Sequence, residues 1–154
     1  IIGILAAIAI PQYRKIIEKT KAMEMFINVK ALAEASNIYM LQTGSITTNF
    51  NDLDIKIAGT QTAKNKIRNN TIFYSLNSDD ISAYIDPQPD IADNTTYTLL
   101  ISYSLVDSPD GPKGSIFCGA RLGNNQRDLY KSICKSLGGE EIGLRGMFIT
   151  FKIK

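Results

Sequence analysis

Apolar residues are concentrated at the start of the chain and continue beyond it at helical spacing. Residues 1–11 carry no polar side chain, and from Gln12 onward apolar or small residues recur three or four positions apart. Thr43-Gly44 ends the pattern, because glycine adopts the left-handed conformation just past a helix at little steric cost. We predict one helix from Ile1 to about Thr43, roughly 65 Å long at 1.5 Å per residue. Its recurring positions form two sets: Ile16, Met23 and Phe26, and Met25, Val29, Leu32, Ser36 and Tyr39.

The rest of the chain has a different pattern. Short runs with strand character alternate with turn-forming clusters, which predicts an antiparallel sheet with the second half of the helix packed on one face. The fold class is therefore α+β. We predict the strands at residues 72–76, 81–85, 97–106, 115–120 and 147–153, a short helix within 125–137, and a loop-like segment at 45–70 whose residues 53–57 suit a strand or a turn.

The 154 residues suffice for one domain with a core, and we divide them into a long helix (1–44) and a globular head (45–154). The apolar residues 1–11 have no partner inside so small a head. They cover about half of the ~20 residues that cross a bilayer, so we interpret them as the second half of a span. Since the chain begins at Ile1 without Met, we expect a processed or incomplete product. The competing interpretation is the end of a signal peptide, with Ala7-Ile8-Ala9 as its cleavage site.

Composition argues against catalysis. The chain contains no histidine, the commonest general base and metal ligand, and no nucleophile-elbow or phosphate-loop motif. We expect no enzyme activity, cofactor or metal. The net charge of +2 gives no argument for nucleic acid, although residues 12–30 alone sum to +3, from five Lys or Arg against two Glu. Cys118 and Cys134 lack zinc-site spacing and fit a disulfide in an oxidising compartment better, with unpaired thiols as the alternative.

The segment Ile1-Ile2-Gly3-Ile4-Leu5-Ala6-Ala7-Ile8-Ala9-Ile10-Pro11-Gln12-Tyr13 resembles the hydrophobic N-terminal segment of type IV pilins almost residue for residue. The long helix, the glycine at its end and the C-terminal cysteine pair extend the resemblance more loosely. In that family the segment follows about eleven residues that begin with an N-methylated Phe and contain a Glu. The resemblance also implies that the cysteines delimit a region on the outside of a fibre.

By this resemblance the protein is a pilus subunit, held in the inner membrane before assembly and at the cell surface afterwards. Identical subunits would form a helical filament, with a prepilin peptidase and an assembly platform as partners. Motility, adhesion and DNA uptake are the roles that the family offers. Gly3 and Pro11 both weaken a helix, so we expect a weak point between them. The filament core would be formed by Ile1, Ile2, Ile4, Leu5, Ile8 and Ile10.

Other interpretations stay open. A secretion-system pseudopilin explains everything but the cysteine pair, and a membrane-anchored exported binding domain explains the apolar start. Asp86, Asp90 and Asp93 are a weak calcium hypothesis. Asn69 and Asn94 stand in Asn-x-Thr sequons. The segment between the cysteines carries Arg121, Arg127 and Lys131 against Asp128, which suits solvated surface or contact with acidic partners such as DNA.

Overall fold

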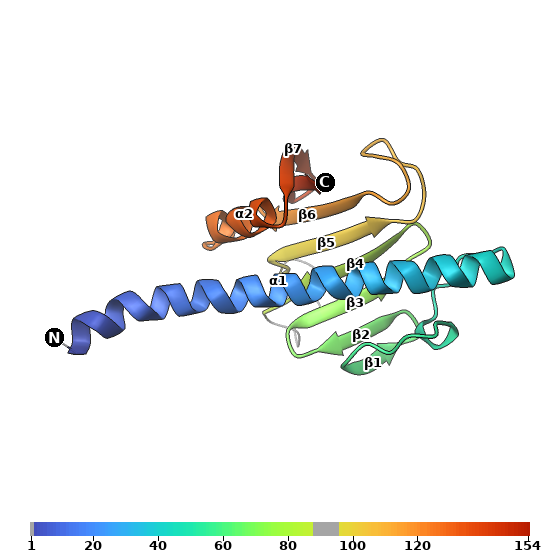
Figure 1. The fold of residues 1–154 in the computed structure, drawn as a ribbon. Coiled ribbons are helices and arrows are strands. Elements are labelled where there is room, and N and C mark those ends of the chain that lie inside the picture. Colours follow the sequence, from blue (N-terminus) through green and yellow to red (C-terminus); the bar gives the residue numbers. More distant parts are fainter. Residues whose placement is uncertain (1, 88–95) are drawn as a thin grey trace.

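A single long helix lies across one face of an antiparallel sheet and projects beyond it (Figure 1). The computed structural model describes residues 2–87 and 96–154. Within them, the helices and strands are α1 (Ile2–Thr43), the 3-10 turn η1 (Phe50–Asp52), β1 (Thr60–Ala63), β2 (Lys66–Asn69), β3 (Ile72–Leu76), β4 (Asp80–Ile85), β5 (Leu99–Ser104), β6 (Ile116–Arg121), α2 (Arg127–Ser136), β7 (Gly139–Arg145) and β8 (Phe148–Ile153). The α+β prediction is confirmed.

The sheet follows the chain almost in order. Its strands are arranged β1-β2-β3-β4-β5-β6-β8-β7, and every described neighbouring pair is antiparallel. Hairpin connections account for this order, except that α2 separates β6 from the β7–β8 hairpin. Helix α2 packs against β6, β7 and β8, while α1 packs against β3, β4 and β5. Both helices therefore cover different parts of one sheet.

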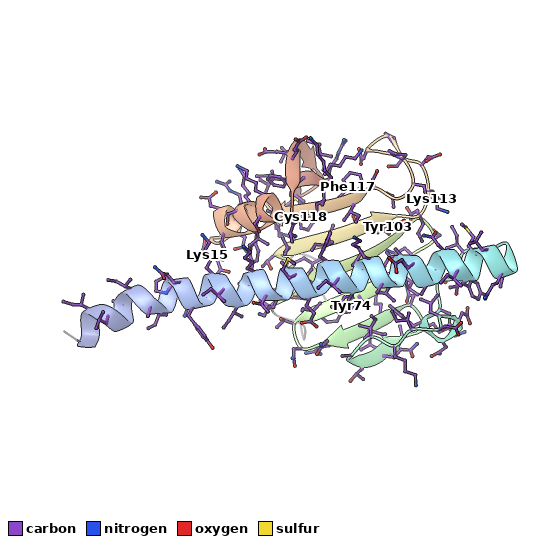
Figure 2. All side chains as sticks on the ribbon, viewed as in Figure 1. Lys15, Tyr74, Tyr103, Lys113, Phe117 and Cys118 are labelled. Atoms are coloured by element: carbon purple, nitrogen blue, oxygen red, sulfur yellow. A yellow bond between two sulfur atoms is a disulfide. The ribbon has the colours of Figure 1, made fainter. Side chains whose placement is uncertain are left out.

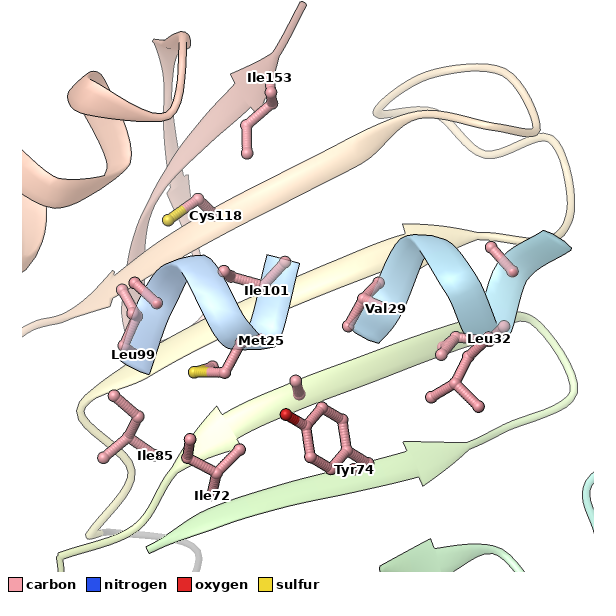
Figure 3. Packing of buried hydrophobic residues seen from close by; sticks show 14 of the residues in the cluster. Met25, Val29, Leu32, Ile72, Tyr74, Ile85, Leu99, Ile101, Cys118 and Ile153 are labelled. Atoms are coloured by element: carbon pink, nitrogen blue, oxygen red, sulfur yellow. The ribbon is translucent and has the colours of Figure 1, made fainter. Parts of the chain in front are cut away.

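The second half of α1 forms one wall of the core. Residues at intervals of three and four are fully or nearly buried against the sheet, which is the spacing that keeps side chains on one face of a helix. Met25, Val29 and Leu32 lie over Ile72, Tyr74, Ile85, Leu99 and Ile101 (Figure 3). Ala22 and Ser36 extend the same stripe at its two ends.

The first predicted set of helical positions lies outside this wall. Ile16 and Met23 are exposed, and Phe26 is half-buried at the edge of the core. A helix has only one face turned toward the sheet, so the second set occupies it and the first set cannot. The end of the helix agrees with the prediction: Gly44 has a φ of 77° and its amide donates to the carbonyl of Met40 at 2.8 Å.

The sequence misplaced several strands. Residues 45–70 were predicted to be loop-like, yet β1 and β2 lie there, and β7 was not predicted at all. The 53–57 alternation forms no strand: Leu53 caps η1, while Ile55 and Ile57 pack against the edge of the core. The predicted strand at 97–106 is shorter, at Leu99–Ser104. Strands β3, β4, β6 and β8 and helix α2 lie where the sequence placed them, within one or two residues at most ends.

Candidate assembly surface

The first half of α1 is an apolar arm that the head does not cover. Ile4, Leu5, Ile8 and Ile10 expose between 54% and 69% of their surface, and Tyr13 and Ile16 are equally exposed. Figure 2 shows the side chains of this stretch pointing away from the helix on several sides, with the sheet beginning only further along it. We call residues 2–16 the arm.

Helix rigidity keeps the arm away from the head. α1 is continuous from Ile2 to Thr43, so the arm cannot fold back onto the sheet while the helix stays intact. Monomeric soluble proteins rarely expose contiguous apolar surfaces of this kind, and such patches mark contacts with proteins or membranes. None of the helices in the described part of the chain is both long and apolar enough to span a bilayer.

Gly3 and Pro11 both lie within the continuous helix. A β-carbon on Gly3 would meet nothing within 4 Å, so the glycine is not required by packing. Pro11 provides no amide proton for the helical bond to the carbonyl of Ala7, which leaves the helix weaker there. The expected weak point concerns an assembled filament, so it stays a prediction. Ile1 and the side chain of Ile2 lie outside what the structure describes.

Polar contacts hold α1 to the head where the arm ends. Tyr130 of α2 donates its hydroxyl proton to Glu18 at 3.0 Å, and Lys21 pairs with the other oxygen of that carboxylate at 3.1 Å. Further along, Asn69 donates to Glu24 at 3.3 Å and Asn28 donates to the hydroxyl of Tyr74 at 2.8 Å.

These contacts affect the titration of both tyrosines. Burial raises the pKa of Tyr130 to about 12, and the negative charge of Glu18 adds to the effect. Burial likewise raises the pKa of Tyr74 to about 12, against a smaller opposite effect of the hydrogen bond from Asn28. Sequence reasoning missed these partners, since hydrogen bonds between residues far apart in the chain leave no local pattern.

A disulfide joins Cys118 on β6 to Cys134 on α2. Both side chains are fully buried, so the bond ties α2 to the sheet from within the core. Figure 2 labels Cys118 near the ribbon of α2. The segment that the bond encloses includes the turn 122–126 and most of α2.

The basic residues of this enclosed segment are not gathered into a bare cationic surface. Arg127 lies 3.7 Å from Asp128, and Lys131 lies 3.9 Å from Glu141 on β7. Arg121 is also engaged in an interaction, so it is not a free cation. Exposed pairs of this kind contribute little stability. The arrangement offers no specific support for a nucleic-acid partner.

The weaker sequence hypotheses gain nothing further from the structure. Asp86 is buried and accepts a hydrogen bond from Thr96, while Asp90 and Asp93 lie outside the described residues. In the described part of the chain, His, Cys, Asp and Glu side chains do not gather in any group of three or more that suits a metal ion. Asn69 is engaged with Glu24, and Asn94 lies outside the described residues.

Comparisons with protein-family models, with curated proteins and with solved structures gave no match to this chain.

Proposed function

We propose that this chain is the structural subunit of an extracellular filament of the type IV pilus kind. The observation that carries the proposal is the arm, whose apolar side chains surround a helix that the head cannot cover. Such a helix must be surrounded by lipid before assembly and by the equivalent helices of neighbouring subunits afterwards. The resemblance of residues 1–13 to pilins and the layout of one long helix on an antiparallel sheet both support this role.

Burial of the arm contributes a large favourable free energy to polymerisation. Burying one large aliphatic side chain is worth roughly 1.5–3 kcal/mol, so Ile4, Leu5, Ile8 and Ile10 together contribute on the order of 10 kcal/mol before the entropic costs of association. Because the arm lies at one end of the subunit and the head at the other, its contacts with siblings are head-to-tail. Repeated head-to-tail contacts that do not close into a ring build a helical fibre.

The disulfide favours the pilus subunit over the runner-up, a secretion-system pseudopilin. By family resemblance the main pseudopilins stabilise the corresponding region with calcium, whereas this chain joins Cys118 to Cys134 there. A membrane-anchored exported binding domain is the third candidate. It would use the arm only as an anchor and would remain monomeric in the membrane. By the same resemblance, the inner membrane, a prepilin peptidase and an assembly platform handle the subunit before it reaches the cell surface.

Removal of the arm tests the proposal. We expect the full chain, purified in detergent, to form filaments visible by negative-stain electron microscopy once the detergent is withdrawn. A variant lacking residues 1–12 should instead sediment as a soluble monomer with an intact core, because the buried face of α1 starts only at Ala22.

Matched point variants distinguish specific burial of the arm from nonspecific hydrophobic association. Ile8→Lys places a charge in the arm, and we expect it to abolish filaments. Leu144→Lys changes a side chain that is as exposed as Ile8 but lies on the edge strand β7, and filaments should persist. Filament formation by the truncated chain would contradict the proposal, as would a full chain that stays monomeric without detergent.

A further inference from the structure

A groove lies beside the second half of α1, far from the arm. It has a volume of about 300 Å³ and is bounded by α1 on one side and by the segment around η1 on the other. Part of its lining is apolar. The apolar lining residues are Ala31, Ala35, Ile38, Tyr39 and Ile55.

The groove also has acidic lining residues. Glu34, Asp52 and Asp54 line it, and no basic residue of the described chain does. Asp52 already accepts a hydrogen bond from Thr47 at 2.6 Å, but Glu34 and Asp54 are exposed and have no ion pair among the described residues. The groove therefore suits an occupant that combines apolar side chains with positive charge.

The end of the arm has that combination. Tyr13 and Ile16 expose large apolar side chains, and Arg14, Lys15 and Lys19 stand between and beside them. In the described part of the chain these three cations form no ion pair either. Lys15 is exposed to solvent.

One chain cannot bring these two surfaces together. Ile16 and Ala35 are nineteen positions apart on one continuous helix, which separates them by roughly 28 Å along its axis. Any contact between them joins two copies, and it is head-to-tail because the two surfaces are different. Opposite charges on facing surfaces fix the register of such a contact and disfavour wrong ones.

We propose that the acidic groove receives the Tyr13–Lys19 segment of a second copy and thereby sets the stagger between neighbouring subunits. This inference rests on the proposed filament function and names the partner surface within it. Apolar packing along the arm has little preference for one position over the next. The pairing of Arg14, Lys15 and Lys19 with Glu34 and Asp54 supplies that preference.

Charge reversal on each side, alone and together, tests the pairing. The groove variant combines Glu34→Lys with Asp54→Lys, and the arm variant combines Arg14→Glu with Lys19→Glu. We expect each to raise the critical concentration for filament formation at least tenfold in low salt, because like charges then face each other. Combining both variants in one chain should restore most of the loss.

Two controls test whether the effect is specific to the groove and independent of folding stability. Glu140→Lys combined with Lys154→Glu reverses an exposed ion pair between β7 and the end of the chain, outside both surfaces, and should leave assembly unchanged. Thermal unfolding of each variant should stay at the wild-type temperature, since Glu34 and Asp54 contribute no hydrogen bond or ion pair to the described head.

Cysteine cross-linking tests directly which residues of adjacent subunits lie close together. Ile16→Cys combined with Ala35→Cys should give disulfide-linked ladders of chains in assembled filaments, whereas Ile16→Cys combined with Leu144→Cys should not. If wild-type filaments form but the combined charge variant is no better than either parent, the groove pairing is wrong and the filament function stands. If wild type forms no filaments, the proposed function itself is contradicted.

Discussion

The backbone at Gly139 passes very close to the end of α2. A β-carbon there would lie 2.6 Å from the carbonyl oxygen of Cys134 and 2.8 Å from the β-carbon of Phe151. We predict that Gly139→Ala lowers the free energy of unfolding by about 1–3 kcal/mol, since neither neighbour can move without disturbing the core. Urea unfolding followed by circular dichroism measures the change.

Gly3→Ala is the matched control for Gly139→Ala. Nothing lies within 4 Å of a β-carbon at Gly3, so the head should unfold at the wild-type urea concentration while the arm gains helix propensity. An equal loss of stability in both variants would mean that the contact with α2 is not the cause.

Three buried tyrosines with a raised pKa, Tyr74, Tyr84 and Tyr130, make stability fall at alkaline pH. Tyr74 and Tyr130 keep their protons up to a pKa of about 12 in the folded chain, whereas an unfolded tyrosine ionises near 10. Stability is therefore fully present below pH 10 and decreases between about pH 10 and 12, by about 1 kcal/mol per pH unit for each tyrosine.

Urea midpoints measured from pH 8 to 12 check this slope. Tyr74→Phe should lower the overall stability, because Asn28 loses its partner, and should also make the alkaline decline shallower. An unchanged slope in Tyr74→Phe would show that another group causes the decline.

At the scale of elements, the disulfide holds α2 against the sheet. It closes a loop between Cys118 and Cys134, which have a sequence separation of 16. On the chain-entropy estimate such a loop is worth about 3 kcal/mol. We predict that Cys118→Ala combined with Cys134→Ala loses about that amount and that hydrogen exchange accelerates first in α2. Stoichiometric labelling of free thiols in denatured, unreduced wild type would show instead that the bond does not form.

The strands that the sequence revealed have at least two buried positions each, whereas the missed strands have one (β2) or none (β1 and β7). Strand β3 reads Ile72-Phe73-Tyr74-Ser75-Leu76, and its buried Ile72, Tyr74 and Leu76 give the alternating apolar pattern of a strand. Strand β1, Thr60–Ala63, is exposed at every position, and β7 is largely exposed too. Both lie at the two edges of the sheet. Their stability comes from backbone pairing with a neighbour, which any polar sequence can supply, so composition carried no signal.

For the molecule as a whole, the arm could be predicted and the groove could not. The arm is a run of consecutive apolar residues, so its inability to be buried in a small head follows from the sequence alone. The groove combines Glu34 on α1 with Asp54 and Ile55 from a loop, and their proximity depends on how the chain turns after Gly44. The same holds for the contact between Glu18 and Tyr130, which lie 112 positions apart.

Helix α1 forms both the arm and one wall of the core. Tension on the arm therefore acts on the contacts between α1 and the sheet. A pull along the axis of α1 loads the contacts of Met25, Val29 and Leu32 together, in shear, instead of peeling them apart one after another. The hydrogen bonds that Glu18 accepts from Tyr130, Glu24 accepts from Asn69 and Asn28 donates to Tyr74 resist the same sliding motion. Beyond the expected weak point between Gly3 and Pro11, α1 contains no further glycine or proline, so load is shared along the whole buried length of that helix.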